Sequence, residues 1–190
     1  MTLSGRFFNP GPVELEPEVA QAMLRPMIGH RGPEARALVG RLQPGLQALF
    51  GTTRPVMLAT GSATAMMEAA IRSGVRERVL CIVSGTFGER MADTAERCDK
   101  AVVRLHVPRG AVLEPDLLAR MMDGPPVDAV TMVHSETSTG ALAPVAELIA
   151  RLRTLNDVVT IVDAVTSLGG TPIETDRWGA DFIFTGSQKA

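Results

Sequence analysis

The chain has 190 residues, of which 45% are hydrophobic and 21% are charged, so its composition is that of a packed soluble domain and not of a disordered segment. Its 19 Lys and Arg nearly balance 21 Asp and Glu, and no block of like charges occurs, which argues against a nucleic-acid partner. No signal-peptide pattern and no run of roughly 20 apolar residues is present. The sequence therefore predicts a cytoplasmic protein with no membrane partner.

The cysteines and histidines of this sequence suggest neither a disulfide framework nor a metal centre. Cys81 and Cys98 are too few and too far apart for paired-cysteine chemistry. The apolar neighbours of Cys81 favour a small buried side chain at that position. No two of the histidines have the spacing of metal ligands, so the sequence predicts no metal site.

Two helices are predicted near the amino terminus. After a Pro/Gly-rich entry at residues 9–12, a helix is expected over residues 17–24, because Pro17 suits a first helical turn. A second helical pattern covers residues 33–50. The Pro44-Gly45 pair inside it should kink or split that helix.

From residue 53 onward, short apolar runs alternate with helical patterns. The runs are too short for helices and predict strands at residues 55–59, 79–84, 101–107, 128–134, 158–163 and 181–185. Helical patterns lie between most of them, at residues 64–72, 89–98, 115–122 and 145–155. This alternation predicts an α/β fold of three layers, a mainly parallel sheet with helices on both faces. Residues 164–180 have little helical pattern, which leaves the direction of the last strand open.

The end of the sequence is unusual for such a fold. The last apolar run ends at Thr185, and no helix follows to cover it. A buried strand without its covering layer exposes apolar surface, so we expect that part of the fold is not represented. The expected organisation is an amino-terminal arm of residues 1–30 and an incomplete large domain of residues 31–190.

Residues suited to ligand binding follow the predicted strands. In open α/β sheets, ligands bind beyond the carboxyl ends of the strands, where loops meet helix N-termini. Residues 60–64 (T-G-S-A-T) stand in that setting and are typical of a phosphate-binding turn, although an ordinary helix cap by Ser62 or Thr64 would also explain them. The glycine patterns of dinucleotide folds and P-loops are absent.

Two further loops carry candidate ligand contacts. Phe87 lies between Gly85 and Gly88, which leave it room to project over a flat ligand, and a plain core position is an equal alternative. Residues 134–140 (H-S-E-T-S-T-G) place more hydrogen-bonding side chains after a strand than a turn requires. A capping loop remains the alternative there.

An acid and a lysine follow the last two predicted strands. Asp163 comes directly after an apolar run, and a buried carboxylate needs a partner, which a cationic ring nitrogen or a nearby arginine would provide. Only Lys100 and Lys189 can provide lysine chemistry, since the other basic residues are all arginine. We expect Lys189 at the same edge of the sheet as Asp163, where a lysine partly removed from water attacks carbonyl groups.

These loops together predict a pyridoxal 5′-phosphate site. The aldehyde of that cofactor requires a lysine, its ring nitrogen a carboxylate, and its phosphate a helix N-terminus. Each motif alone is common. Their joint occurrence at successive strand ends is what favours this cofactor.

The sequence resembles the class V, fold-type I pyridoxal-phosphate aminotransferases, especially the alanine–glyoxylate and serine–pyruvate group. The resemblance is carried by residues 9–12 (N-P-G-P), 134–140, 162–170 (V-D-A-V-T-S-L-G-G) and 186–190 (G-S-Q-K-A). It implies a ping-pong transaminase that moves an amino group from a small amino acid, such as alanine or serine, to glyoxylate or pyruvate. It also implies a homodimer, and a smaller carboxyl-terminal domain that follows the lysine and is missing from this chain.

The resemblance further implies a role for each site residue. Lys189 forms the Schiff base and moves the substrate proton, and Asp163 pairs with the pyridinium nitrogen. The other implied contacts are to the phosphate (Ser62, Ala63, Thr64 and Gln188), to one face of the ring (Phe87), to the opposite face (Val165) and to the 3′-oxygen (Thr137). The sequence departs from the commonest family pattern at Ala63, where many relatives have Gly, and at Phe87, where some have Trp or Tyr.

Two alternatives remain open. The first is another class V enzyme with the same cofactor, such as aminoethylphosphonate transaminase or a lyase resembling cysteine desulfurase or kynureninase. The second is an inactive fragment, because the arginine that grips the substrate carboxylate in this family is expected beyond Lys189.

Overall fold

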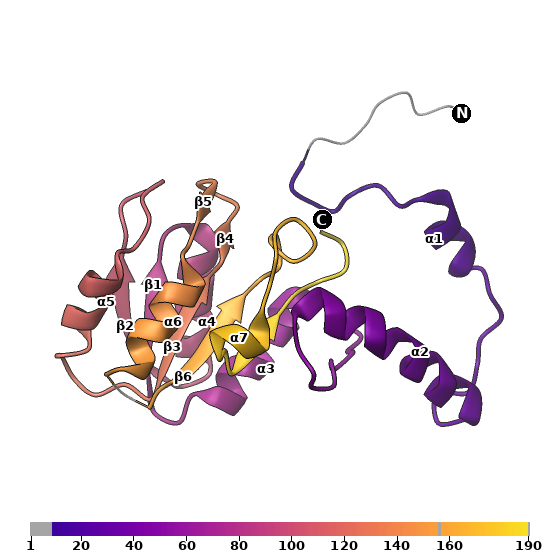
Figure 1. Ribbon diagram of the computed structural model, residues 1–190, viewed down its shortest axis with the longest axis horizontal. Coiled ribbons are helices and arrows are strands. Elements are labelled where there is room, and N and C mark those ends of the chain that lie inside the picture. The colour runs from indigo at the N-terminus through magenta and orange to yellow at the C-terminus, as the bar shows by residue number, and fades with distance from the viewer. Residues whose placement is uncertain (1–8, 156, 190) are drawn as a thin grey trace.

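The computed structural model describes residues 9–155 and 157–189 (Figure 1); residues 1–8 of the predicted arm and Ala190 of the predicted domain lie outside the described residues. The helices are α1 (Pro17–Ala22), α2 (Pro33–Phe50), α3 (Ala63–Gly74), α4 (Thr86–Arg97), α5 (Pro115–Met121), α6 (Val145–Arg153) and α7 (Thr175–Trp178). The strands are β1 (Arg78–Val83), β2 (Ala101–His106), β3 (Ala129–Val133), β4 (Ser135–Glu136), β5 (Ala141–Leu142), β6 (Val159–Asp163) and β7 (Phe182–Phe184).

One parallel sheet forms the centre of the molecule, with the strand order β2-β1-β3-β6-β7. Each neighbouring pair runs in the same direction, and the register places Val133 of β3 opposite Asp163 of β6. The open question of the last strand is thereby answered, since β7 is parallel to β6. The short strands β4 and β5 form a separate antiparallel hairpin beyond β3.

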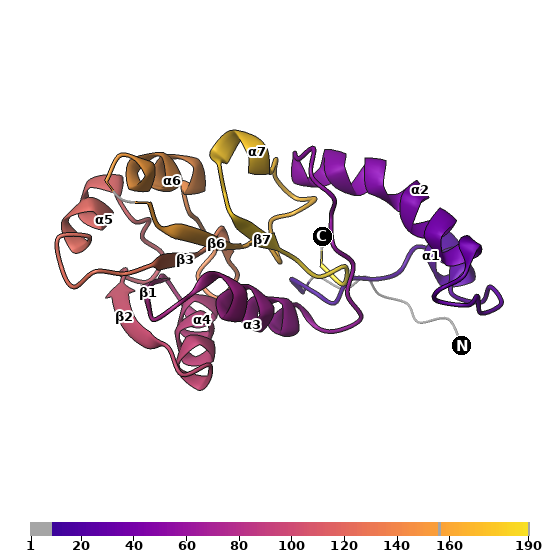
Figure 2. The same cartoon turned by 90° about the horizontal axis from the view of Figure 1, so that it is seen from below.

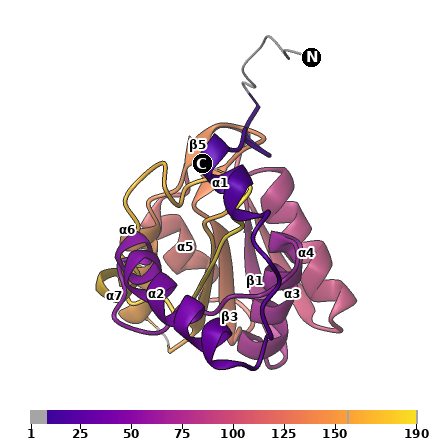
Figure 3. The same ribbon diagram turned by 90° about the vertical axis from the view of Figure 1, so that its right-hand side faces the viewer.

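Helices cover both faces of this sheet, so the three-layer fold is confirmed. Figures 2 and 3 show α3 and α4 on one face and α5, α6 and α7 on the other. Successive side chains of a strand point to opposite faces, and Ile161 accordingly joins the core under α3 and α4, whereas Val162 joins the core under α5 and α6. Cys81 is fully buried in the first of these cores, as its apolar neighbours predicted.

The amino-terminal helices extend away from the sheet, as Figures 1 and 2 show. Helix α1 buries no residue, and α2 buries only Phe50. The predicted split at Pro44 is wrong, because α2 continues through it to Phe50 and ends at Gly51 in the left-handed conformation (φ 58°). A proline removes one helical hydrogen bond, and the turns on either side keep theirs. No helix in the described parts of the chain is long and apolar enough to span a membrane.

The predicted strand at residues 55–59 is also wrong. These residues pair with no strand, and Met57 is 93% exposed. The side-chain amide of Gln43 takes the place of a neighbouring strand at Val56: it accepts from the backbone N–H (2.8 Å) and donates to the carbonyl oxygen (2.9 Å). A short apolar run indicates that a segment can adopt an extended conformation. It does not indicate whether another strand lies beside that segment to pair with it.

Candidate functional site

The predicted site residues are carried by loops at the carboxyl ends of the parallel strands. We call this side of the sheet its carboxyl edge. Parallel strands bring their carboxyl ends to the same side, so the loops after β1, β3, β6 and β7 are neighbours. The residues concerned are Phe87 at the start of α4, Thr137 after β4, Asp163 and Val165 at the end of β6, Gln188 and Lys189 after β7, and Ser62, Ala63 and Thr64 at the start of α3.

Asp163 is buried, with 4% of its surface exposed, and it is short of hydrogen-bond donors. Its Oδ1 accepts from the backbone N–H of Val165 (2.8 Å), and Oδ2 has no donor among the described residues. Burial raises the pKa of this carboxyl to about 6, and the charge of Glu136 adds to the effect, while Arg90 and Lys189 oppose it. A buried carboxylate in this state is suited to a cationic partner.

Lys189 extends from the loop after β7 and lies against the entry segment of residues 9–13. The backbone N–H of Val13 donates to the carbonyl of Gln188 (3.0 Å). Gly11 packs so closely on the lysine side chain that a Cβ at position 11 would overlap Lys189 Cδ. The positive charge of Lys189 acts on Asp163 and lowers its pKa, although the described residues include no hydrogen bond between the two side chains.

The start of helix α3 offers free donors beside the lysine loop. Ser62 is the N-cap, and its Oγ accepts from Ala65 N–H (3.4 Å). The backbone N–H groups of Ala63 and Thr64 have no acceptor within the described chain, as is usual for a first helical turn. A Cβ at Gly186 would lie 3.2 Å from Ala63 Cβ, so the loop that leads to Lys189 packs against this turn.

Phe87 and Thr137 are held by different contacts. The Phe87 ring packs against the core under α3 and α4, and the Arg90 guanidinium carbon lies 5.0 Å from the ring centroid. The hydroxyl of Thr137 donates to Thr166 Oγ1 (3.1 Å), which in turn donates to the carbonyl of Ser135 (2.9 Å). The loop after β3 is thereby tied to the loop after β6.

Glu136 is a buried acid that the sequence reasoning did not single out, although it stands in the predicted hydroxyl-rich loop. It is 1% exposed and accepts hydrogen bonds from the first turn of α4. No sequence signal pointed to this contact, because the pattern placed the start of the helix at residue 89. Helix α4 is preceded by Gly85, which has no side chain to cap it, so an acceptor must come from elsewhere.

The residues at this edge fit the expected cofactor. An under-satisfied buried carboxylate suits a protonated ring nitrogen, the free N–H groups of α3 suit a phosphate, and Lys189 provides an amine. Surface hollows elsewhere, beside Arg151 and beside Asp176, contain none of the predicted site residues. The described residues contain no group of three or more His, Cys, Asp or Glu that could hold a metal ion.

The family model described as aminotransferase class-V matches residues 30–190. An uncharacterized aminotransferase of Methanocaldococcus jannaschii is 39% identical over 183 residues, which cover 95% of this chain and 47% of that protein. The (S)-ureidoglycine–glyoxylate transaminase of Bacillus subtilis is 33% identical over 184 residues, covering 95% of this chain and 44% of the relative.

The fold has a close counterpart among solved structures. The alanine–glyoxylate aminotransferase of Nostoc sp. superimposes with a TM-score of 0.92 at 35% identity, covering 99% of this chain and 51% of that one. The chain therefore spans about half the length of the relatives it matches.

Proposed function

Because this chain belongs to the class-V aminotransferases, which use pyridoxal 5′-phosphate, we propose that the protein transfers an amino group from a small amino acid, such as alanine or serine, to glyoxylate or pyruvate. Two of the relatives described above are named as glyoxylate aminotransferases, which supports this acceptor. The observation that carries the proposal is the buried carboxyl of Asp163, short of a cation, at the sheet edge that also bears Lys189.

Asp163 holds the proton on the ring nitrogen. Bound pyridoxal phosphate accepts the electron pair released when the substrate Cα loses its proton, provided that its ring nitrogen is protonated. Asp163 favours that protonated state because its Oδ2 is free to accept the N–H. The same contact gives the buried carboxylate a positively charged hydrogen-bond partner, which none of the described residues provides.

Lys189 would hold the cofactor aldehyde through its Nζ until the amino group of a substrate takes its place, and the amine released in that exchange would carry the proton from the substrate Cα to the cofactor carbon C4′. Its aliphatic part packs on Gly11, so the entry segment limits the directions in which the amine points. That restriction favours proton transfer along one face of the substrate.

The other residues bind and orient the cofactor. The N–H groups of the α3 turn at Ser62, Ala63 and Thr64 hold the phosphate, with Gln188 beside them. Phe87 and Val165 would pack on opposite faces of the ring, and the Thr137 hydroxyl would lie near the 3′-oxygen. Together these contacts exclude water from the reacting carbon.

Reconstitution tests the assignment of the lysine. The protein in its full natural length, mixed with pyridoxal phosphate, should develop a visible absorption band that Lys189→Ala abolishes. Lys100→Ala is the matched control and should keep the band, because this other lysine donates to the carbonyl of Arg76 beside the amino ends of β1 and β2, opposite the carboxyl ends where the site residues lie. A band of unchanged intensity in Lys189→Ala would overturn the assignment.

A donor screen separates the reaction classes. Amino acids are added one at a time to the coloured protein, and bleaching by alanine or serine is the expected result. Bleaching restricted to aminoethylphosphonate, cysteine or kynurenine would replace the proposed reaction by one of the alternatives. A full-length protein that never develops a band would support the inactive alternative.

The proposal includes a homodimer with an arm of residues 1–30, a large domain that begins at residue 31, and a cytoplasmic location. The dimer is supported by apolar side chains of α1 and α2 that remain substantially exposed, including Val19, Leu38, Val39 and Leu42. Analytical ultracentrifugation should give twice the mass of one chain, and a monomer at micromolar concentration would remove this part.

A further inference from the structure

Helix α4 begins without a capping side chain of its own. Its N-cap is Gly85, and the N–H groups of its first residues have no acceptor within the helix. The N–H groups of the first three residues nevertheless all find acceptors in the loop after β3. Thr86 N–H donates to Ser138 Oγ (2.9 Å), and the N–H groups of Phe87 and Gly88 each donate to Glu136 Oε2 (3.1 Å).

Glu136 makes these contacts as a fully buried acid. Its second oxygen, Oε1, accepts from the backbone N–H of Ser138 (3.1 Å) and from the Ser138 hydroxyl (2.6 Å). Among the described residues, the groups that hydrogen-bond to Glu136 are all uncharged donors, and none of them is a basic side chain. The positive end of the α4 dipole favours a negative charge at this position.

The glycine at position 85 supports the same interpretation independently. A Cβ there would overlap Ser138 Oγ and would lie 2.6 Å from both Cγ and Cδ of Glu136. An ordinary N-cap residue such as Ser or Asp therefore does not fit at position 85. Glu136 performs the capping function from a loop that is distant in the sequence.

We infer that Glu136 is the positioning residue that fixes the aromatic and hydroxyl sides of the cofactor site relative to each other. Its carboxylate binds the backbone of Phe87 directly, and the next residue along its own loop is Thr137. Phe87 and Thr137 therefore move as one unit with the first turn of α4. This inference rests on the proposed function, in which these two side chains contact the ring and its 3′-oxygen.

Glu136 also acts on the neighbouring acid. Besides burial, its negative charge contributes to the raised pKa of Asp163. Two buried acids near the carboxyl ends of the adjacent strands β3 and β6 strengthen the preference of this site for a positively charged ring nitrogen. This effect supplements the geometric role, which depends on hydrogen bonds alone.

Glu136→Gln in the full-length protein tests the positioning role. The amide keeps the size of the side chain but has one acceptor oxygen instead of two, so in either orientation its N–H₂ group faces backbone donors, and the contacts to Phe87 and to Ser138 cannot both be kept. We expect the dissociation constant for pyridoxal phosphate to rise by roughly tenfold or more. The circular dichroism of the visible band should also change, because it reports how the ring lies against Phe87.

Asp128→Asn is the matched control. Asp128 also accepts three backbone N–H groups, those of residues 76–78, but at the opposite edge of the sheet. This variant should lower the melting temperature as Glu136→Gln does, while cofactor affinity and the dichroic band stay as in the wild type. If Glu136 had only a structural role, both variants would lower the melting temperature and leave the cofactor affinity and the dichroic band unchanged.

Ser138→Ala provides a milder second variant, because it removes the acceptor of Thr86 N–H and one donor to Glu136 while keeping the carboxylate. It should weaken cofactor binding less than Glu136→Gln, with a dichroic change of the same sign. Wild-type affinity and dichroism in both variants, alongside a band that depends on Lys189, would overturn this inference alone. Absence of a band that depends on Lys189 in the wild type would instead remove the proposed function and this inference with it.

Discussion

The amino edge of the sheet, formed by the amino ends of its strands, and the opposite carboxyl edge differ in how completely their acidic side chains are supplied with hydrogen-bond donors. At the amino edge, Asp128 accepts three backbone N–H groups, and although burial opposes the change, these bonds lower the pKa of its carboxyl. Asp181 is similar: burial raises its pKa, but Thr160 N–H, Arg153 and the Thr160 hydroxyl together lower it. Both acids are well supplied with donors.

At the carboxyl edge the outcome depends on the residue. Glu136 is supplied with donors as fully as Asp128 is, whereas Asp163 has one backbone donor and a pKa raised mainly by burial to about 6. The fold thus provides hydrogen-bond donors for the neighbouring acids, but it leaves the carboxylate of Asp163 with too few of them. An acid that the fold leaves short of donors is adapted to a ligand, whereas saturated acids stabilise the polypeptide.

The largest effect should come from Asp163→Asn in the full-length, cofactor-loaded protein. The amide cannot hold the proton on the ring nitrogen, and loss of a buried charge partner costs about 3 kcal/mol or more, which lowers the rate roughly 100-fold. Stopped-flow bleaching by an amino donor measures that rate. A decrease of less than about threefold would contradict the pairing of Asp163 with the ring.

The pH dependence of stability should separate the two edges in the cofactor-free, full-length protein. Folding raises the pKa of Asp163 from 3.8 to about 6, so between these values the folded state binds more protons than the unfolded state, and stability falls as pH rises. At about 1.4 kcal/mol per pKa unit, this group lowers the unfolding free energy by up to about 3 kcal/mol at neutral pH.

Urea denaturation of wild type and Asp163→Asn across pH 4 to 7.5 measures this contribution. The Asn variant should gain stability relative to wild type as pH rises, and a constant difference would show that burial does not act on Asp163. The sign reverses for Asp128→Asn. The pKa of Asp128 is lowered, so its contribution is complete at neutral pH and is lost as pH falls through that lowered value.

Asp181→Asn should have a smaller effect, confined to stability. Asp181 Oδ2 accepts from Arg153 (2.6 Å) and from the backbone N–H (2.8 Å) and hydroxyl (2.9 Å) of Thr160. Removing the charge weakens these bonds and should cost about 2 kcal/mol of unfolding free energy. Cofactor affinity should remain as in the wild type, because the carboxylate lies at the amino edge. Weaker cofactor binding would show that the edges are coupled.

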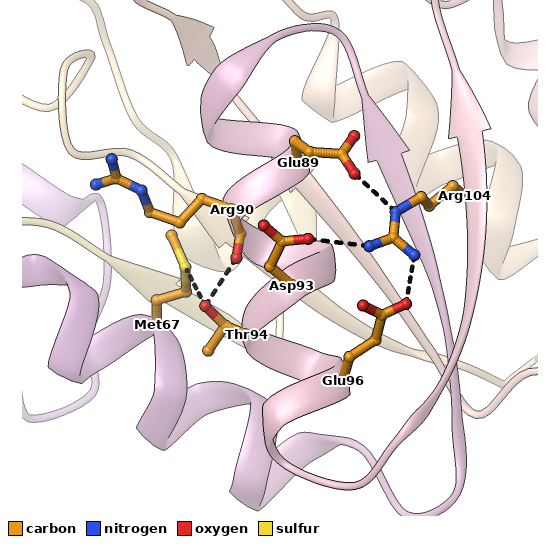
Figure 4. Close-up of polar contacts among 7 residues, drawn as sticks. All are labelled: Met67, Glu89, Arg90, Asp93, Thr94, Glu96 and Arg104. Atoms are coloured by element: carbon orange, nitrogen blue, oxygen red, sulfur yellow. Dashed lines mark hydrogen bonds and ion pairs between the residues drawn. The ribbon is translucent and has the colours of Figure 1, made fainter.

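The smallest effect is expected at the surface cluster of α4. Figure 4 shows the Arg104 guanidinium between Glu89 (2.8 Å), Asp93 (3.0 Å) and Glu96 (2.5 Å). Arg104→Met leaves three like charges on one helix face and should cost about 1 kcal/mol or less in low salt. Repeating the melt in 1 M NaCl should reduce the loss, since exposed charges are screened. A loss that salt does not change would mean that packing is what matters there.

Helix α4 shows where prediction from the sequence stopped. The pattern predicted a helix over residues 89–98, but the helix begins at Thr86. Gly85 and Gly88 gave no local reason to start earlier, because glycine is a poor helix former. The early start depends on Glu136 and Ser138, which are about fifty residues away in the sequence and are brought close only by the pairing of β1 with β3. The strand predicted at residues 55–59 does not form for a related reason. A strand needs a neighbouring strand, and only the tertiary fold decides whether one lies beside it.

The sequence by itself determined the alternation of strands and helices, the three-layer parallel architecture and the loops that carry Asp163 and Lys189, because hydrophobic periodicity and turn chemistry are local properties of the chain. The tertiary structure alone decided which acids receive donors. Whether a carboxylate is satisfied depends on backbone N–H groups that only the packing of distant segments brings within hydrogen-bond distance. That is why Asp163 was recognised from its position in the sequence, whereas the contacts of Glu136 became visible only in the folded chain.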